Sequence, residues 1–215
     1  MSLNKLLLNK DRELLKDRID LMFRKCPDMM SRKISEANVQ QAFVLDTVLS
    51  LSDAVFDEQL CVGSFEDTAM ETLIQMGYTF GMCGIDPAIN EDLDSFHSRL
   101  NGKRFWDIIF STSVIEHVQD DELFISQICD LLAPKGYAVL TCDFNNDYVD
   151  GAPVPATVVR QYTKKDLEER LPAVLAKHGC NVVGVGDWEG EPDFIYQGHL
   201  YSFATFVFRK GSTGV

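Results

Sequence analysis

The sequence lacks any apolar run close to the roughly 20 residues that a membrane-spanning helix requires. Basic residues are also few, because 20 Lys and Arg stand against 33 Asp and Glu and leave a net charge of −13. A surface this acidic disfavours contact with nucleic acid backbones and anionic lipid, both of which repel it. We therefore expect neither nucleic acid nor a membrane as a partner.

Patterns typical of metal sites and disulfide frameworks are absent too. The six cysteines include no C-x-x-C pair, and the four histidines no H-x-x-x-H spacing, so we expect no metal site. Cys61, Cys83 and Cys142 lie in apolar runs, which indicates buried free thiols in a reducing compartment. The first residues, MSLNKLLLNK, lack the long apolar stretch and cleavage site of a secretory signal. Together these features predict a cytoplasmic protein.

Apolar runs alternate with amphipathic stretches from residue 58 onward. Strands are predicted at 59–62, 78–85, 106–113, 137–144, 181–188 and 200–210, and helices at 67–76, 118–133 and 164–179, the last capped by Thr163. This alternation predicts an α/β fold, a doubly wound sheet of mostly parallel strands. Because no helix separates the last two strands, we expect them to pair antiparallel as a hairpin at one edge. Residues 90–104 are polar and have no clear pattern.

The first 57 residues have a helical character instead. Helical segments are predicted within residues 3–25, where Leu14, Leu15, Ile19 and Met22 share one face, and over 36–51, with Ser35 as the cap. A chain of 215 residues predicts one domain. We expect residues 1–57 to form a helical cap on a core of residues 58–215. The cap either packs on the sheet or forms a partial lid.

Polar residues gather where four of the predicted strands end. Ligands of doubly wound sheets bind beyond the carboxyl ends of the strands, where the strand order reverses. The four ends carry Gly63–Thr68, Asp86, Ser111–His117 and Asp143. Side chains from these segments are therefore predicted to meet in one site.

In order and spacing, these segments resemble the class I S-adenosylmethionine-dependent methyltransferases, over residues 58–210. A glycine loop follows the first strand, and Asp86 ends the second strand 23 residues after Gly63. FWDIIFSTSVIEHV, LLAPKGYAVLT and YTKKDLEERL are similar to the family's fourth strand, its turn into the fifth strand and a late helix start. The resemblance implies a Rossmann-like fold, S-adenosylmethionine as cofactor, and methyl transfer to a small molecule or glycan, at oxygen.

The loop after the first strand departs from the family pattern of an acid followed by three spaced glycines. The segment CVGSFED keeps Gly63 alone and has Cys61 in place of the acid. Glu66 and Asp67 at the helix start would repel a pyrophosphate, which disfavours a nicotinamide-dependent oxidoreductase. We expect Glu66 or Asp67 to contact the cofactor's ammonium, while Asp67 alternatively only caps the helix. The eroded loop leaves a non-catalytic binding or scaffold protein as the alternative function.

The resemblance also implies roles for single residues. The predicted cofactor contacts come from Gly63, Ser64, Glu66, Asp67, Asp86, Ser111, Thr112 and Ser113. Asp86 is suited to the two ribose hydroxyls, unless it only forms an Asx turn with Pro87. For removal of the acceptor proton, the candidates are His117 and Asp143.

The acceptor pocket is expected to come from the N-terminal helices and from loops 145–161 and 188–199. Trp188, Phe194, Tyr196 and His199 form an aromatic and polar set that suits a small polar ring such as a sugar. The alternative is that these aromatics only pack a long loop onto the sheet edge. The sequence leaves the oligomeric state open.

Overall fold

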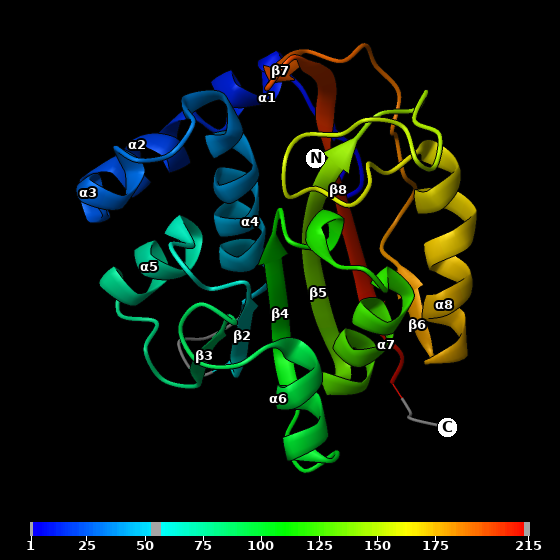
Figure 1. Cartoon of the computed structure of the whole chain (residues 1–215). Coiled ribbons are helices and arrows are strands. Elements are labelled where there is room, and N and C mark those ends of the chain that lie inside the picture. Colours follow the sequence, from blue (N-terminus) through cyan, green and yellow to red (C-terminus); the bar gives the residue numbers. More distant parts are fainter. Residues whose placement is uncertain (1, 53–56, 213–215) are drawn as a thin grey trace.

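The structure is a computed structural model that describes residues 2–52 and 57–212, and these residues surround one central sheet (Figure 1). Its strand order is β1-β8-β5-β4-β2-β3, with β6 and β7 also paired to β8. The strands are β1 (Leu6–Leu7), β2 (Gln59–Val62), β3 (Met82–Ile85), β4 (Trp106–Thr112), β5 (Leu132–Phe144), β6 (Cys180–Val182), β7 (Phe194–Tyr196) and β8 (His199–Lys210). The predicted doubly wound, Rossmann-like fold class is confirmed.

Parallel pairing joins β3, β2, β4 and β5, whereas β8 runs antiparallel to β5. The predicted antiparallel pairing of the last two strands is confirmed by β6 and β8. However, β6 has only three residues, because Gly184 adopts a φ of +72° and ends the extended backbone. In addition, β8 is an inner strand, since β1 and β7 also pair along it.

Helices cover both faces of the sheet (Figure 1). They are α1 (Asn9–Leu14), α2 (Lys16–Lys25), α3 (Pro27–Met30), α4 (Asn38–Leu51), α5 (Thr68–Gln75), α6 (Leu93–Leu100), α7 (Asp121–Leu131) and α8 (Leu171–Lys177), with short 3-10 helices η1 (Ser35–Ala37) and η2 (Ile115–His117) and a π-helical segment η3 (Asp166–Arg170). Helices α4 and α5 pack on one face, with α2 against both, and α6, α7 and α8 lie together on the other. No helix within the described ranges is long and apolar enough to cross a membrane.

Alternation of side chains along the strands produces two separate cores. In β4, Ile109 belongs to the cluster under α7, while its neighbour Phe110 belongs to the cluster under α4. Phe43 and Val44 of α4 are buried in that second cluster. Of the two placements predicted for the N-terminal helices, α4 therefore packs on the sheet, and its first turn reaches the strand ends.

Several local predictions for the N-terminal segment are wrong. Leu6–Leu7 form β1 instead of helix, because they pair with β8 and the Asn4 side chain bonds both backbone groups of Val207. Leu14 is 62% exposed, so it does not share the buried face. The Ser35 hydroxyl donates to Glu36 and caps no helix. Residues 53–56, at the end of the predicted cap, lie outside the described residues.

Two capping interactions fix helices of the core. The prediction that Thr163 begins a helix is confirmed, because the Asp166 backbone N–H donates to its Oγ1 and the Thr163 N–H donates to Asp166. Residues 90–104, which had no clear pattern, contain α6. Its cap is Asp92, whose carboxylate accepts from the Ser95 backbone N–H at 2.8 Å.

Candidate active site

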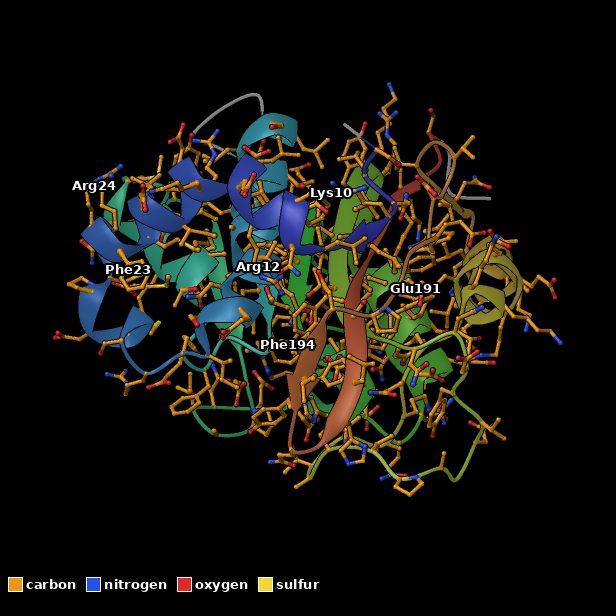
Figure 2. The ribbon with its side chains drawn as sticks, turned by 90° about the horizontal axis from the view of Figure 1, so that it is seen from above. Lys10, Arg12, Phe23, Arg24, Glu191 and Phe194 are labelled. Carbon is orange, nitrogen blue, oxygen red and sulfur yellow. The ribbon has the colours of Figure 1, made fainter. Side chains whose placement is uncertain are left out.

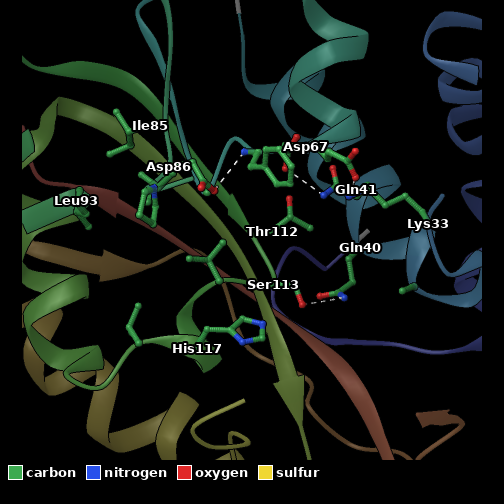
Figure 3. A pocket seen from close by; sticks show the side chains of 18 of the residues that line it. Lys33, Gln40, Gln41, Asp67, Ile85, Asp86, Leu93, Thr112, Ser113 and His117 are labelled. Carbon is green, nitrogen blue, oxygen red and sulfur yellow. Dashed lines mark hydrogen bonds and ion pairs between the residues drawn. The ribbon is translucent and has the colours of Figure 1, made fainter. Parts of the chain in front are cut away.

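A cavity of about 680 Å³ lies at the carboxyl ends of β2, β3 and β4, beside the first turn of α4. This is where the strand order reverses, as expected for a ligand site in such a sheet. The structure brings six predicted cofactor residues to its wall: Gly63, Glu66, Asp67, Asp86, Thr112 and Ser113. His117 lines it as well, and Figure 3 shows this ring with Asp67 and Asp86 around the cavity.

Gly63 forms a turn that other residues would not fit. Its φ is +83°, and its N–H donates to the Ile85 carbonyl at 2.8 Å. A Cβ atom at this position would lie 2.3 Å from Val114 Cγ2. Both the backbone angle and the space therefore require glycine. Because Gly63 has no side chain, a ligand can approach the backbone at this part of the cavity wall.

The Asp86 carboxylate is held by two backbone N–H groups. Its Oδ1 accepts from Ala88 at 2.7 Å, which is the Asx turn foreseen as an alternative, and its Oδ2 accepts from Phe65 at 3.3 Å. An ionised carboxylate offers about four acceptor positions. Two of these remain for a ligand, so the turn and a ligand contact are compatible.

Asp67 both caps α5 and lines the cavity. Its Oδ1 accepts from the Met70 N–H at 2.7 Å and its Oδ2 from Gln41 Nε2 at 3.1 Å. Burial raises the pKa of Asp67, although these hydrogen bonds oppose the change. The carboxylate is thus fixed in position and withdrawn from water.

Glu66 is engaged elsewhere. Its carboxylate accepts from Arg32 Nε at 2.9 Å and Nη2 at 2.6 Å, and Lys33 Nζ lies 3.8 Å away. The hydrogen bonds from Arg32 hold the pKa of Glu66 below its usual value. This ion pair joins the segment before α4 to the loop after β2 at the mouth of the cavity.

Two of the predicted cofactor residues do not line either of the cavities at these strand ends. Ser64 packs behind β3, where its Oγ would lie 2.8 Å from a Cβ placed on Gly84. Ser111 is 2% exposed, and its Oγ has no hydrogen-bond partner among the described residues. The alternation of β4 turns Ser111 away from the cavity side, while Thr112 and Ser113 at the strand end remain accessible to it.

A second cavity, of about 240 Å³, adjoins the first and shares five wall residues with it: Ile34, Ala37, Gln40, Ser113 and His117. The rest of its wall comes from Asp143, from residues 155–158, and from the aromatic residues Phe194, Tyr196, Tyr201 and Phe203. Figure 2, seen from above, shows Phe194 where the β7–β8 hairpin approaches the N-terminal helices. The ring of Phe194 lies 5.1 Å from that of Tyr201 and 4.7 Å from that of Phe203, centroid to centroid.

The aromatic set predicted for an acceptor is thus divided. Phe194 and Tyr196 line the second cavity, but Trp188 does not. Trp188 is buried in the cluster under α7 and α8, where its Nε1 donates to the Thr205 carbonyl at 3.0 Å. His199 pairs with Tyr196 across the β7–β8 turn and lies outside the wall.

The two candidate proton acceptors both line the second cavity. His117 Nδ1 lies 2.8 Å from the Thr157 carbonyl oxygen. Since a carbonyl only accepts, Nδ1 carries the hydrogen, and Nε2 of the neutral ring has a free lone pair. Asp143 is 4% exposed and hydrogen-bonds to Glu116, which lies behind it.

Sequence reasoning missed several wall residues. Gln40 and Gln41 come from α4, and Tyr201 and Phe203 from β8. The two adjacent glutamines in the otherwise apolar stretch VQQAFVL are a signal, because buried polar side chains need partners. Nothing local marks the β8 residues, since a buried strand is apolar on both faces. Among the described residues, no cluster of His, Cys, Asp and Glu gathers to hold a metal.

Comparison with known proteins agrees with this geometry. A family model described as a methyltransferase domain matches residues 63–185. The chain belongs to this methyltransferase family. A search of curated protein sequences found no match.

Solved structures with the same fold include an S-adenosylmethionine-dependent methyltransferase from Archaeoglobus fulgidus, with a TM-score of 0.56 and 12% identity, covering 81% of this chain and 94% of that chain. The [4+2]-cyclase SpnF has a TM-score of 0.54 and 12% identity, and the match covers 97% of this chain and 99% of that chain. CalS10, an amino pentose methyltransferase from Micromonospora echinaspora, has a TM-score of 0.51 and 17% identity, and the match covers 84% of this chain and 93% of that chain. At these identities the similarity shows the fold, and one of the three is described by a different reaction.

Family membership makes this chain an S-adenosylmethionine-dependent methyltransferase, with S-adenosylmethionine as its cofactor. It disfavours both alternatives, the nicotinamide-dependent oxidoreductase and the scaffold protein. The residues of the larger cavity fit this cofactor. Its wall has a close-approach turn at Gly63, a carboxylate with free acceptor positions at Asp86, and a buried carboxylate at Asp67. These features suit a nucleoside that carries positive charge and no phosphate.

Proposed function

We propose that the larger cavity holds S-adenosylmethionine with Asp86 accepting from the ribose hydroxyls. The support is the orientation of its carboxylate by two backbone N–H groups with two acceptor positions left over. The turn at Gly63 admits the cofactor to the backbone, and the Thr112–Ser113 strand end lies beside it. Apolar side chains of Ile85, Leu93, Val118 and Phe124 offer a surface for the adenine ring.

Asp67 rather than Glu66 is proposed to meet the cofactor's ammonium. Glu66 is already paired with Arg32 and Lys33, so much of its charge is neutralised. Asp67 is 3% exposed and its carboxylate contacts a backbone N–H and an amide. A buried carboxylate that has neutral donors alone gains most from a cationic ligand. Asp67 thus replaces the acid that is missing at Cys61.

The smaller cavity is proposed to hold the acceptor, a small molecule or a glycan unit that is methylated at a hydroxyl oxygen. The observation that carries this proposal is the shared wall, because Gln40, Ser113 and His117 face both cavities. Aromatic rings on one side and polar groups on the other suit a small polar ring. No Lys or Arg is found among the described residues of this wall, which disfavours an anionic acceptor. CalS10, which has the same fold, is described as acting on an amino pentose.

When bound, S-adenosylmethionine supplies a methyl group on a positively charged sulfur. The protein then contributes position, exclusion of water and removal of a proton. His117 Nε2 and the Asp143 carboxyl both line the acceptor cavity and are the candidate proton acceptors. The Thr157 carbonyl fixes the His117 ring in the tautomer that a base requires.

The test is a transfer assay with S-adenosylmethionine labelled in its methyl group. The acceptor panel contains neutral methyl glycosides, the matching amino sugars and the matching uronic acids, and products are located by mass spectrometry and NMR. Label in a sugar methyl ether, with neutral sugars preferred over uronic acids, is the expected result. Label found on amine nitrogen or carboxylate alone, or no transfer to any member, would contradict the proposed acceptor.

A further inference from the structure

A row of polar groups runs from α4 to β8 along the wall of the smaller cavity. Gln40 Nε2 lies 3.5 Å from Ser113 Oγ, and Ser113 Oγ donates to Glu116 Oε1 at 2.5 Å. The carboxyl groups of Glu116 and Asp143 hydrogen-bond to each other, and the Tyr201 hydroxyl donates to Asp143. The row therefore contains two carboxyl groups in direct contact.

The burial of Glu116 and Asp143 indicates how many protons the two carboxyl groups hold. Glu116 is fully buried, and its Oε2 has no hydrogen-bond partner of normal geometry among the described residues, although the Asp143 backbone N–H lies close enough to lower the pKa of Glu116. Burial raises the pKa of both groups, and the charge of Glu116 raises that of Asp143 further. Two carboxylates in contact inside a protein cannot both ionise near neutral pH, so they share one proton and titrate as a pair.

We propose that Glu116 and Asp143 form a single base that holds one proton at rest and takes a second from the acceptor hydroxyl. Asp143 lines the smaller cavity and is the catalytic residue of the pair. Glu116 lies behind it and is a positioning residue that retains the shared proton. This inference rests on the proposed acceptor site, and it gives Glu116 a role that its neighbour His117 in the chain does not share.

A second observation points to a ligand in the same cavity. Gln40 is 3% exposed and lines both cavities, and its Oε1 has no hydrogen-bond partner among the described residues. An unpaired buried amide oxygen is costly unless a ligand supplies a donor. Gln40 and Asp143 thus place polar side chains on separate walls of the cavity, which suits an acceptor with more than one hydroxyl group.

The step balances without a further reactant. The acceptor oxygen gives its proton to Asp143 while its electron pair forms the bond to the methyl carbon. The electrons of the methyl–sulfur bond remain on sulfur. The pair goes from one proton and one negative charge to two protons and no charge, and it later loses the extra proton to water.

Other titratable groups act on the pair from each neighbouring element. They are His117 on η2, Cys142 on β5, Tyr162 in the following loop and Tyr201 on β8, while Tyr196 on β7 acts on Tyr201. Burial raises the pKa of Cys142, Tyr162 and Tyr201, so these three stay neutral near neutral pH. The pair itself gains a proton as the pH falls, and catalysis is lost when it becomes doubly protonated.

The first experiment needs no substrate and uses the full chain. Infrared difference spectra are recorded through a pH titration in H2O and D2O. We expect a deuterium-sensitive band of a protonated carboxyl group that persists at neutral pH and disappears in Asp143→Asn or Glu116→Gln. Asp67→Asn is the matched control, because Asp67 is also buried with a raised pKa. Absence of the band in the parent protein, or its survival in both pair variants, would overturn the shared proton.

The second experiment measures methyl transfer to the best hydroxyl acceptor of the panel. Asp143→Asn is expected to lower kcat by about 100-fold or more, the usual range for a lost general base. Glu116→Gln replaces the protonated carboxyl group that donates to Asp143 with a weaker amide donor, so it should shift the acid limb of the kcat profile to higher pH. Equal pH profiles for the parent and Glu116→Gln would refute the positioning role of Glu116.

The two proposals fail in different ways. Calorimetry with S-adenosylhomocysteine should give equal affinity for the parent and both pair variants, because neither side chain lines the larger cavity. If no hydroxyl acceptor is found but the infrared band behaves as expected, the acceptor proposal is wrong and the proton pair stands. If transfer to hydroxyls occurs with no band and no loss in Asp143→Asn, the pair is wrong and the acceptor proposal stands.

Discussion

The two cavities share a wall but are assembled in different ways. The larger is built mainly from segments that directly follow β2, β3 and β4, so most of its residues lie within a few positions of a strand end. The smaller combines α4, the end of β5, residues 155–158 and the β7–β8 hairpin. Its walls come from positions far apart in the chain. Local patterns therefore predict the cofactor side, and tertiary packing decides the acceptor side.

The strongest way to break the cofactor side is Gly63→Ala. The new Cβ meets Val114 Cγ2 at 2.3 Å while the backbone keeps a φ of +83°. Backbone strain and overpacking together should lower the free energy of unfolding by about 2–4 kcal/mol. Displacement of the loop should lower the affinity for S-adenosylhomocysteine by about 100-fold or more. Urea denaturation and calorimetry measure the two effects.

Gly77→Ala is the matched control for that change. Gly77 has a φ of +99°, but a Cβ there meets nothing within 4 Å. It should cost only the backbone strain, about 1 kcal/mol, and leave the affinity unchanged. If both variants lose the same stability and the same affinity, the close approach of Val114 has no role in shaping the cavity.

The fold could be predicted where hydrophobic patterns are continuous. Strands β2 and β4 and helix α5 lie within one or two residues of their expected ends. Strand β1 could not be found, because Leu6–Leu7 become a strand only through β8, which is distant in the sequence. Helix α6 was missed because its few apolar residues are interrupted by polar ones, although the Asp92 cap was a local signal.

The second prediction separates a turn from a ligand contact on the cofactor side. Asp86→Ala should weaken S-adenosylhomocysteine by at least about tenfold, because charge-assisted hydrogen bonds to the ribose are lost. Asp86→Asn keeps an oxygen for the Ala88 N–H, so it should retain the thermal stability of the parent and still bind more weakly. Parental affinity in both variants would leave Asp86 with the turn alone.

The third prediction distinguishes the neighbouring acids of the first loop. Asp67→Asn keeps the cap of α5 but loses the charge, so the affinity for S-adenosylmethionine should fall by about tenfold. Glu66→Gln only disturbs an exposed pair with Arg32, and the affinity should change by less than about twofold. Equal losses, measured by calorimetry, would mean that the ammonium contact is not specific to Asp67.

Protonation of Asp67 should change the stability of the protein and its affinity for S-adenosylmethionine in opposite directions. Burial raises its folded-state pKa, so ionisation penalises folding above that pKa, and the penalty is relieved as the pH falls toward the unfolded value. Asp67→Asn should therefore be at least as stable as the parent at neutral pH. The affinity of the parent for S-adenosylmethionine should instead decrease as the pH falls through the same raised pKa, while that of Asp67→Asn stays flat.

The candidate site was only partly accessible from the sequence for a physical reason. Gly63, Asp67 and Asp86 each follow a strand directly, and parallel strands bring their ends together. The contact between Glu116 and Asp143 depends on the register of β4 with β5 and on burial of both groups. A sequence pattern shows two acids at strand ends, but it does not show that water is excluded from them.

The smallest expected effect sharpens the boundary of the site within β4. Ser111 was expected to contact the cofactor, yet its hydroxyl is buried without a partner among the described residues and does not line the cavity. Ser111→Ala should leave the affinity for S-adenosylhomocysteine unchanged and should be neutral or stabilising by up to about 1 kcal/mol, since an unpaired buried hydroxyl is removed. Ser113→Ala provides the contrast, because Ser113 lines both cavities and donates to Glu116. It should move the acid limb of the kcat profile to higher pH, since the hydrogen bond from Ser113 lowers the pKa of Glu116. A tenfold loss of affinity in Ser111→Ala would instead place Ser111 in contact with the cofactor and extend the site beneath the strand end.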